Sequence, residues 1–245
     1  MRNIFIKMRF IGTNYCGYQV QKNGVTIMQK IGEAILSVTG ERADVKGCSR
    51  TDSGVHANEY CLSFKTESTI PCENILRGLN HYLPSDISVF SCEEKPLDFH
   101  ARYNCRAKEY IYKIYNGKVR NPFYEGLSLH MWKEIDVEKL NRASKHFIGT
   151  HDFTSFCSAN AKPMESNVRT VMEAEVTREG DMVIFRVKAD GFLYNMVRIM
   201  VGTLLFVHMG KIGEDDISNI IEKKDRAYAG KTASPYGLYL NRVFY

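Results

Sequence analysis

The most informative segment of this 245-residue chain reads Gly47-Cys48-Ser49-Arg50-Thr51-Asp52-Ser53-Gly54-Val55-His56-Ala57. Small residues and two glycines surround one carboxylate, one guanidinium and one imidazole, so little of the segment suits core packing. An alternating apolar stretch follows, with Tyr60, Leu62 and Phe64 at every second position, which predicts a strand. A polar loop held beside a rigid strand commonly presents a catalytic or binding side chain. Asp52 is therefore the first candidate functional residue.

The same residues also fit an ordinary turn. The Asp52 side chain can accept a hydrogen bond from backbone two residues on, and Gly54 can adopt a positive φ without steric cost. Taken alone, the segment favours the turn over a catalytic site, because turn chemistry is common. The remainder of the chain has to decide between the two interpretations.

The composition is that of a globular protein, with 44% hydrophobic and 25% charged residues. A net charge of +5 permits a polyanionic partner without requiring one. The seven cysteines include no C-x-x-C pair, so neither a zinc site nor another metal centre is expected, and reduced thiols in a cytoplasmic protein are the simplest interpretation. The apolar stretch 192–209 contains Asn195, Arg198 and His208, so no membrane span is expected.

Hydrophobic periodicity predicts an α+β protein of two related halves, each with strands and helices in similar order. The expected strands cover 2–10, 43–46, 59–65, 87–93, 107–115, 172–178, 182–190 and 238–244, and the expected helices cover 26–38, 71–82, 136–147, 194–209 and 215–222. We expect two ferredoxin-like (RRM-like) lobes that share a mostly antiparallel central sheet flanked by helices. Residues 1–105 form the lobe with the Asp52 loop, and residues 106–245 complete a cleft between the lobes and supply the expected dimer interface.

Arg198 is the second unusual residue, because it lies near the start of an otherwise apolar predicted helix. A buried guanidinium is costly unless it is paired. Either its long side chain reaches solvent or a carboxylate meets it inside the protein, and the two possibilities stay open on the sequence alone. Asp52 is an attractive partner, since an adjacent arginine would keep that carboxylate ionised.

Several other residues suit RNA binding without being specific for it. Tyr110 and Tyr112 share one face of a predicted strand, where packing is the commoner function and stacking on a base is the alternative. Basic residues near the strands could contact phosphates, although a solvated face explains them as well. Other chemistries fit poorly, because the sequence offers no P-loop, no G-x-G-x-x-G, no second acid beside Asp52 and no orienting partner for a Cys-His pair.

The Asp52 loop resembles the signature G-R-T-D-A-G-V-H-A of the tRNA pseudouridine synthase A family. Five further segments resemble family motifs in the same order along the whole chain. They are Gly12–Gln21 (G-T-x-Y-x-G-W-Q-x-Q), Phe99–Arg102 with Tyr110 and Tyr112 (F-x-A-R…Y-x-Y), Gly149–Phe156 (G-x-H-D-F-x-S-F), Phe192–Arg198 (F-L-x-x-M-V-R) and Ser234–Leu240 (A-P-x-G-L-x-L). Six ordered motifs are far more specific than any one of them.

This resemblance implies a cofactor-free isomerisation of uridine to pseudouridine in tRNA, at positions 38–40 of the anticodon stem-loop. It also implies a homodimer that contacts the anticodon stem-loop and the elbow of tRNA. Carried over residue by residue, Asp52 is the catalytic aspartate, acting as a nucleophile or as a base on the ribose. Arg50 assists flipping of the target base, Tyr110 packs on the uracil, and Arg198 pairs with the aspartate.

Departures from the family pattern leave room for a diverged paralogue with another target position: Ser49 replaces Gly, Ser53 replaces Ala and Tyr18 replaces Trp. Weaker candidate RNA contacts are His56, Arg102, Lys108, Arg186 and Lys188. Two other functions stay open. One is a non-catalytic module that binds or folds tRNA, and the other is a small-molecule hydrolase that uses Asp52 and His56.

Overall fold

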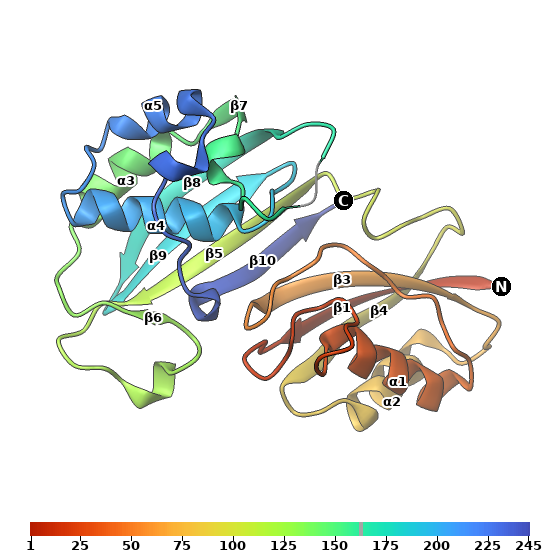
Figure 1. The fold of residues 1–245 in the computed structure, drawn as a ribbon. Coiled ribbons are helices and arrows are strands. Elements are labelled where there is room, and N and C mark those ends of the chain that lie inside the picture. Colours follow the sequence, from red (N-terminus) through yellow and green to blue (C-terminus); the bar gives the residue numbers. More distant parts are fainter. Residues whose placement is uncertain (162–163) are drawn as a thin grey trace. The chain divides into compact units, whose positions relative to one another are not determined.

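The computed structural model describes residues 1–161 and 164–245. The chain divides into two compact units, which are Met1–Arg106 with Tyr239–Tyr245, and Ala107–Leu238 (Figure 1). The last residues return to the first unit because Tyr239 and Leu240 pair in parallel with His56 and Ala57. The sequence analysis assigned 239–245 to the C-terminal lobe of 106–245, whereas these residues group with the first unit. A pairing between segments far apart in the sequence leaves no local pattern that could have shown this.

In the first unit, helices lie on one face of the strands (Figure 1). Its elements are β1 (Arg2–Phe10), α1 (Ile27–Thr39), β2 (Lys46–Gly47), β3 (His56–Thr66), α2 (Cys72–Tyr82) and β4 (Ile87–Lys95). The strand order β4-β1-β3-β2, with every neighbour antiparallel, is that of a ferredoxin-like fold. The loop with Asp52 connects β2 to β3.

Local sequence explains why α1 forms where it does. The Thr26 side chain accepts a hydrogen bond from the Gln29 amide at the N-terminus, and Gly40 ends the helix with a φ of 75°. The apolar stripe Ile27, Ile31 and Ile35 is buried. This packing fixes one end of the loop that follows β1, which is the loop that contacts the Asp52 segment.

In the second unit, helices lie on one face of mostly antiparallel strands (Figure 1). Its elements are β5 (Ala107–Tyr115), β6 (Leu129–His130), α3 (Val137–Lys145), β7 (Gly149–Asp152), β8 (Val168–Glu179), β9 (Met182–Ala189), α4 (Met196–His208) and α5 (Asp216–Lys223), with short 3-10 turns η1 (Pro122–Tyr124), η2 (Thr154–Phe156), η3 (Arg226–Tyr228) and η4 (Pro235–Gly237). The sheet order is β5-β9-β8-β7, and β6 pairs with β5. The last strand of the chain is β10 (Leu238–Phe244).

The α+β class and the mostly antiparallel pairing are confirmed. The strands predicted at 2–10, 107–115 and 238–244 coincide with β1, β5 and β10. The short strands β6 and β7 were not predicted, since two to four residues are too few to show a periodicity. No helix within 1–161 or 164–245 combines the length and hydropathy needed to cross a membrane.

Candidate functional site

The Asp52 loop is a tight turn, as the sequence predicts. The Val55 amide donates a hydrogen bond of 3.2 Å to the Asp52 carbonyl. Gly54 has a φ of 79°, which is the backbone conformation that a type II turn requires at its third position. The Asp52 side chain is half-buried. The turn therefore holds one carboxylate at a defined position instead of leaving it on a mobile loop.

The segment after β1 braces this turn through direct backbone contact. A Cβ on Gly12 would lie 1.9 Å from the Val55 carbonyl oxygen, and one on Gly17 would lie 2.5 Å from the Thr51 carbonyl oxygen. The Tyr18 amide also donates to the Thr51 carbonyl at 3.1 Å. The glycines of the N-terminal motif thus have a physical reason, because only glycine permits two backbones to approach this closely.

His56 lies in the core, which corrects its prediction as an RNA contact. Its side chain is fully buried, and the Gly12 amide donates to Nδ1 at 3.0 Å. The ring also stacks on Tyr239 with centroids 4.5 Å apart. A fully buried imidazole in these contacts cannot reach a phosphate. Its function is to join the turn, the N-terminal loop and the last strand.

Two stacked phenols support the other side of the loop. The rings of Tyr18 and Tyr60 are 4.4 Å apart, and the Tyr60 hydroxyl donates to the Ser49 carbonyl. Burial raises the pKa of both phenols, so they are protonated at neutral pH. Arg50 follows Ser49 directly, and its side chain is exposed. Cys48 and Cys61 are fully buried beside this cluster, as expected for cysteines that pack as small hydrophobes.

The second unit brings three sequence motifs together. Tyr110 on β5 is buried and meets the Phe192 ring edge-on at 5.0 Å. The Tyr112 hydroxyl donates to the Ser234 carbonyl at 2.8 Å. A Cβ on Gly237 would lie 2.6 Å from the Tyr112 ring, so the final motif packs directly on this strand. Residues more than 100 positions apart therefore form one cluster.

The sequence leaves open whether the Arg198 side chain reaches solvent. In the structure it does not extend freely into solvent. Its side chain is half-buried at the start of α4. Nε donates to the Ala233 carbonyl at 2.8 Å, and one terminal nitrogen donates to Asn195 Oδ1 at 2.7 Å. Asn195 has a φ of 61°, a backbone conformation that asparagine tolerates better than most residues. The guanidinium is thus oriented by its own unit.

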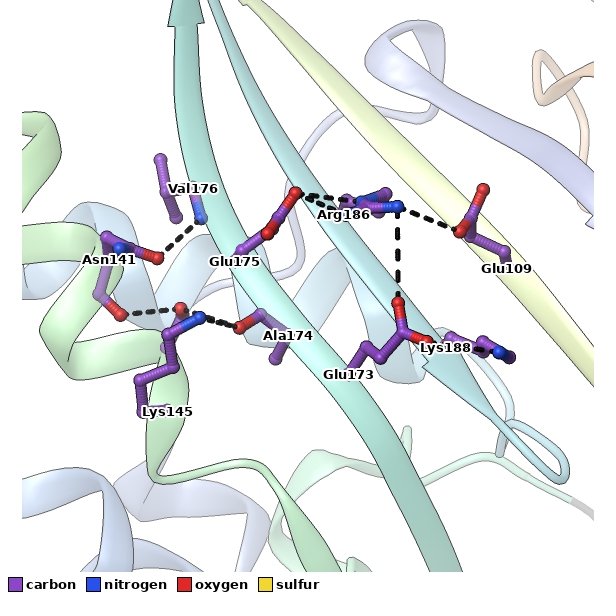
Figure 2. A network of polar contacts seen from close by, with 10 residues as sticks. Glu109, Asn141, Lys145, Glu173, Ala174, Glu175, Val176, Arg186 and Lys188 are labelled. Atoms are coloured by element: carbon purple, nitrogen blue, oxygen red, sulfur yellow. Dashed lines mark hydrogen bonds and ion pairs between the residues drawn. The ribbon is translucent and has the colours of Figure 1, made fainter.

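Arg186 and Lys188 lie in a network of glutamates on the sheet of the second unit (Figure 2). Arg186 donates to Glu175 from Nε at 2.9 Å and lies 3.5 Å from Glu109, and Lys188 Nζ lies 3.0 Å from Glu173. Charges already neutralised in this way gain less from a phosphate. This pairing favours a structural function for both residues over the predicted RNA contact. Lys108 is half-buried on β5.

The motif around Asp152 is structural. Its Oδ1 accepts hydrogen bonds from the Thr154 amide at 3.1 Å and the Thr154 hydroxyl at 2.6 Å, and Oδ2 lies 3.2 Å from Lys224 Nζ. The Thr154 hydroxyl bonds and the Lys224 ion pair lower the pKa of Asp152 below its usual value of 3.8. This carboxylate ties β7 and η2 to the end of α5.

We expect Asp152→Ala to reduce the free energy of unfolding by about 1–2 kcal/mol, because it removes a turn-capping acceptor and a partly exposed ion pair. Because the pKa of Asp152 is lower in the folded protein, its stabilisation is present above pH 3.8 and is lost as the pH falls through the folded-state value. Urea unfolding at a series of pH values measures this. Asp181→Asn, in the exposed β8–β9 turn, is the control, and an equal loss in both variants would contradict the assignment.

Sequence reasoning missed the residues that orient Arg198. Asn195 carries a weak signal, since it precedes a helix, but the Ala233 carbonyl carries none. It also missed Gly202 on α4, where a Cβ would lie 1.6 Å from the Lys231 carbonyl oxygen. Within 1–161 and 164–245, no three His, Cys, Asp or Glu side chains gather closely enough to hold a metal ion.

Comparison with known proteins shows one family. The sequence model described as tRNA pseudouridine synthase matches residues 6–104 and 143–245. The chain is 44% identical to tRNA pseudouridine synthase A of Clostridium acetobutylicum over 245 residues, which is 100% of both chains. It is 45% identical to the enzyme of the same name from Caldicellulosiruptor bescii, again over 100% of both chains.

Proposed function

This chain belongs to the tRNA pseudouridine synthase family, and we propose that it isomerises uridine to pseudouridine in the anticodon stem-loop of tRNA, at positions 38–40, through Asp52. The observation that carries the proposal is the braced turn. Gly12, Gly17 and Gly54 have no side chain, and this permits the backbone packing that holds Asp52 half-buried at a fixed place. An ordinary surface turn would need none of this bracing.

The reaction explains the residue types. The uracil must be detached from its ribose carbon, turned and rejoined through a ring carbon, so the nucleotide has to leave the base stack. Asp52 acts in its ionised form, either as a nucleophile or as the base that removes a ribose proton. We propose that Arg50 helps to extrude the nucleotide and that Tyr110 packs on the uracil while it is detached.

We propose that Arg198 pairs with Asp52. Its guanidinium is held by the Ala233 carbonyl and by Asn195, so it is oriented before substrate binds. A fixed cation keeps a carboxylate ionised and costs little reorganisation during the reaction. We further propose that the protein is a cytoplasmic homodimer whose subunits together contact the anticodon stem-loop and the elbow of tRNA.

Release of tritium from tRNA that carries 5-labelled uridine tests the activity. The C5 hydrogen is lost when the uracil is rejoined through C5, so the wild-type protein should release label in proportion to pseudouridine formed. Binding of tRNA without release would favour the non-catalytic module instead. Lack of any salt-dependent affinity for RNA would favour a small-molecule hydrolase. Substrates that keep a single uridine at position 38, 39 or 40 then identify the target.

We expect Arg198→Gln to move the acid limb of the pH–rate profile to higher pH. Without the neighbouring cation, Asp52 becomes protonated at a higher pH, so the ionised form that reacts is lost earlier as the pH falls. Single-turnover rates from about pH 3.5 to about pH 8 measure this, because an unperturbed aspartate titrates at about pH 3.9. Arg198→Lys, which keeps the charge, should shift the limb less. An unchanged profile in Arg198→Gln would rule out the pairing.

A further inference from the structure

A basic hollow lies on the first unit next to the Asp52 turn. Its volume is about 270 Å³, and all its lining residues belong to the first unit. Its charged and titratable side chains are Asp44, Lys46, Arg50, His100 and Arg102, and Tyr18 and Tyr103 also line it. These residues come from the loop after β1, from the segment before the turn and from the segment after β4, so the hollow is assembled by the fold.

The charges of the basic hollow are unbalanced. Three cations face one carboxylate, and that carboxylate, Asp44, lies 2.6 Å from Lys46 Nζ. The Arg50 and Arg102 side chains are exposed, and among the described residues neither makes an ion pair. The Lys46 and Asp44 side chains are 45% and 79% exposed, so their pairing is weak and the ammonium can accept another partner.

Two of these cations, Lys46 and Arg102, lie near the His100 side chain. Burial lowers its pKa, and Lys46 and Arg102 lower it further, while Asp44 opposes them. The imidazole is therefore neutral at pH 7, and its Nδ1 accepts a hydrogen bond of 3.1 Å from the Arg102 amide. Cations that line one hollow attract an anion to it.

Tyr103 adds an aromatic surface at the same place. Its side chain is 78% exposed, and its ring lies 4.3 Å from the His100 ring at an angle of 38°. An exposed tyrosine beside paired cations is the usual combination in proteins that bind unpaired nucleotides, since the ring stacks on a base and the cations contact its phosphate. The packing of the first unit requires neither an exposed ring at Tyr103 nor cations beside it.

We propose that the basic hollow binds one nucleotide of the RNA substrate, other than the uridine that reacts, with its phosphate on Lys46 and Arg102 and its base against Tyr103. The proposal rests on the proposed function for the identity of the RNA, but the binding itself does not require catalysis. A phosphate has the charge and hydrogen-bonding oxygens that lysine and arginine recognise. This subsite would hold the RNA strand beside the Asp52 turn, since Arg50 both lines the basic hollow and lies two residues before Asp52.

The test compares Lys46→Gln and Arg102→Gln with Lys65→Gln and Arg77→Gln, which remove the same charges from exposed positions outside the hollow. The dissociation constant for tRNA is measured over a range of salt concentrations. Each hollow variant should weaken binding about five- to tenfold and reduce the salt slope by about one, as expected for one lost phosphate contact. kcat/KM should fall by the same factor. The control variants should retain wild-type affinity.

Tyr103 has its own comparison. Tyr103→Ala should weaken binding about tenfold, whereas Tyr103→Phe keeps the ring and should bind as the wild type does. Equal loss in both would contradict stacking. If Lys46→Gln and Arg102→Gln bind tRNA as tightly as the controls do, the subsite is wrong.

Anisotropy with a short labelled oligouridine separates this proposal from the proposed function. Anisotropy gives the affinity of the protein for the oligouridine whether or not the protein forms pseudouridine. Weaker binding in the hollow variants supports the subsite even if tritium release fails. Unchanged oligouridine binding, with tritium released by the wild type, overturns the subsite and leaves the enzyme in place.

Discussion

Asp52→Asn should lower the rate of pseudouridine formation by at least about 10³-fold while tRNA binding stays within about twofold of wild type. Asparagine has nearly the same shape as aspartate but can neither attack a carbon nor accept a proton at neutral pH. The backbone hydrogen bond of the turn, from the Val55 amide to the Asp52 carbonyl, does not involve the carboxylate and is kept in this variant. Single-turnover tritium release and filter binding measure the two quantities.

The control for this variant is Asp98→Asn, which removes a carboxylate from an exposed position of the same unit. It should keep full activity. Full activity in Asp52→Asn would contradict the catalytic assignment, and loss of tRNA binding together with activity would indicate that the carboxylate supports the fold. A circular dichroism melt distinguishes that last case, because a catalytic residue can be changed without lowering the melting temperature.

The sequence was most informative where one residue faces the core and the next does not. In β1 buried and less buried residues alternate from Ile6 to Phe10, as the pleat of a strand requires, whereas Asn3 to Ile6 are all buried. α4 was predicted from its apolar content and begins within two residues of the expected start. By contrast, β7 has no buried residue in its pattern, so its pairing with β8 comes from tertiary structure alone.

The site could be predicted only in part, because its contacts depend on register. Arg186 is neutralised since the pairing of β8 with β9 sets Glu175 directly opposite it, and a shift of one residue would have left it facing an alanine or a valine. His56 looks like an accessible imidazole in the sequence, but the parallel return of Tyr239 buries it. Neither the ion pair of Arg186 nor the burial of His56 can be recognised from the residues next to them in the sequence.

Gly202→Ala should destabilise the second unit more than any other single methyl addition in its helices. A Cβ there would lie 1.6 Å from the Lys231 carbonyl oxygen and 2.8 Å from its carbon, and backbone cannot move aside as a flexible side chain can. The neighbouring Thr203 hydroxyl accepts a hydrogen bond of 2.9 Å from the Gly230 amide, so displacement of residues 230 and 231 would also break this bond. We expect a loss of about 3 kcal/mol or more.

The effect should extend to the proposed active site. The segment that packs on Gly202 continues to Ala233, whose carbonyl orients Arg198 and whose amide donates to the Arg198 carbonyl at 3.0 Å. Moving this segment therefore frees the guanidinium, and tritium release should fall even at temperatures where the variant is folded.

Gly32→Ala on α1 is the matched control, since a Cβ there meets nothing within 4 Å and alanine is the better helix former by about 1 kcal/mol. Calorimetry should show a lower melting temperature for Gly202→Ala and an equal or higher one for Gly32→Ala. Equal melting temperatures in the two variants would mean that the Lys231 backbone can move away from a methyl group at residue 202 at little cost. The fixed orientation of Arg198 would then need another explanation.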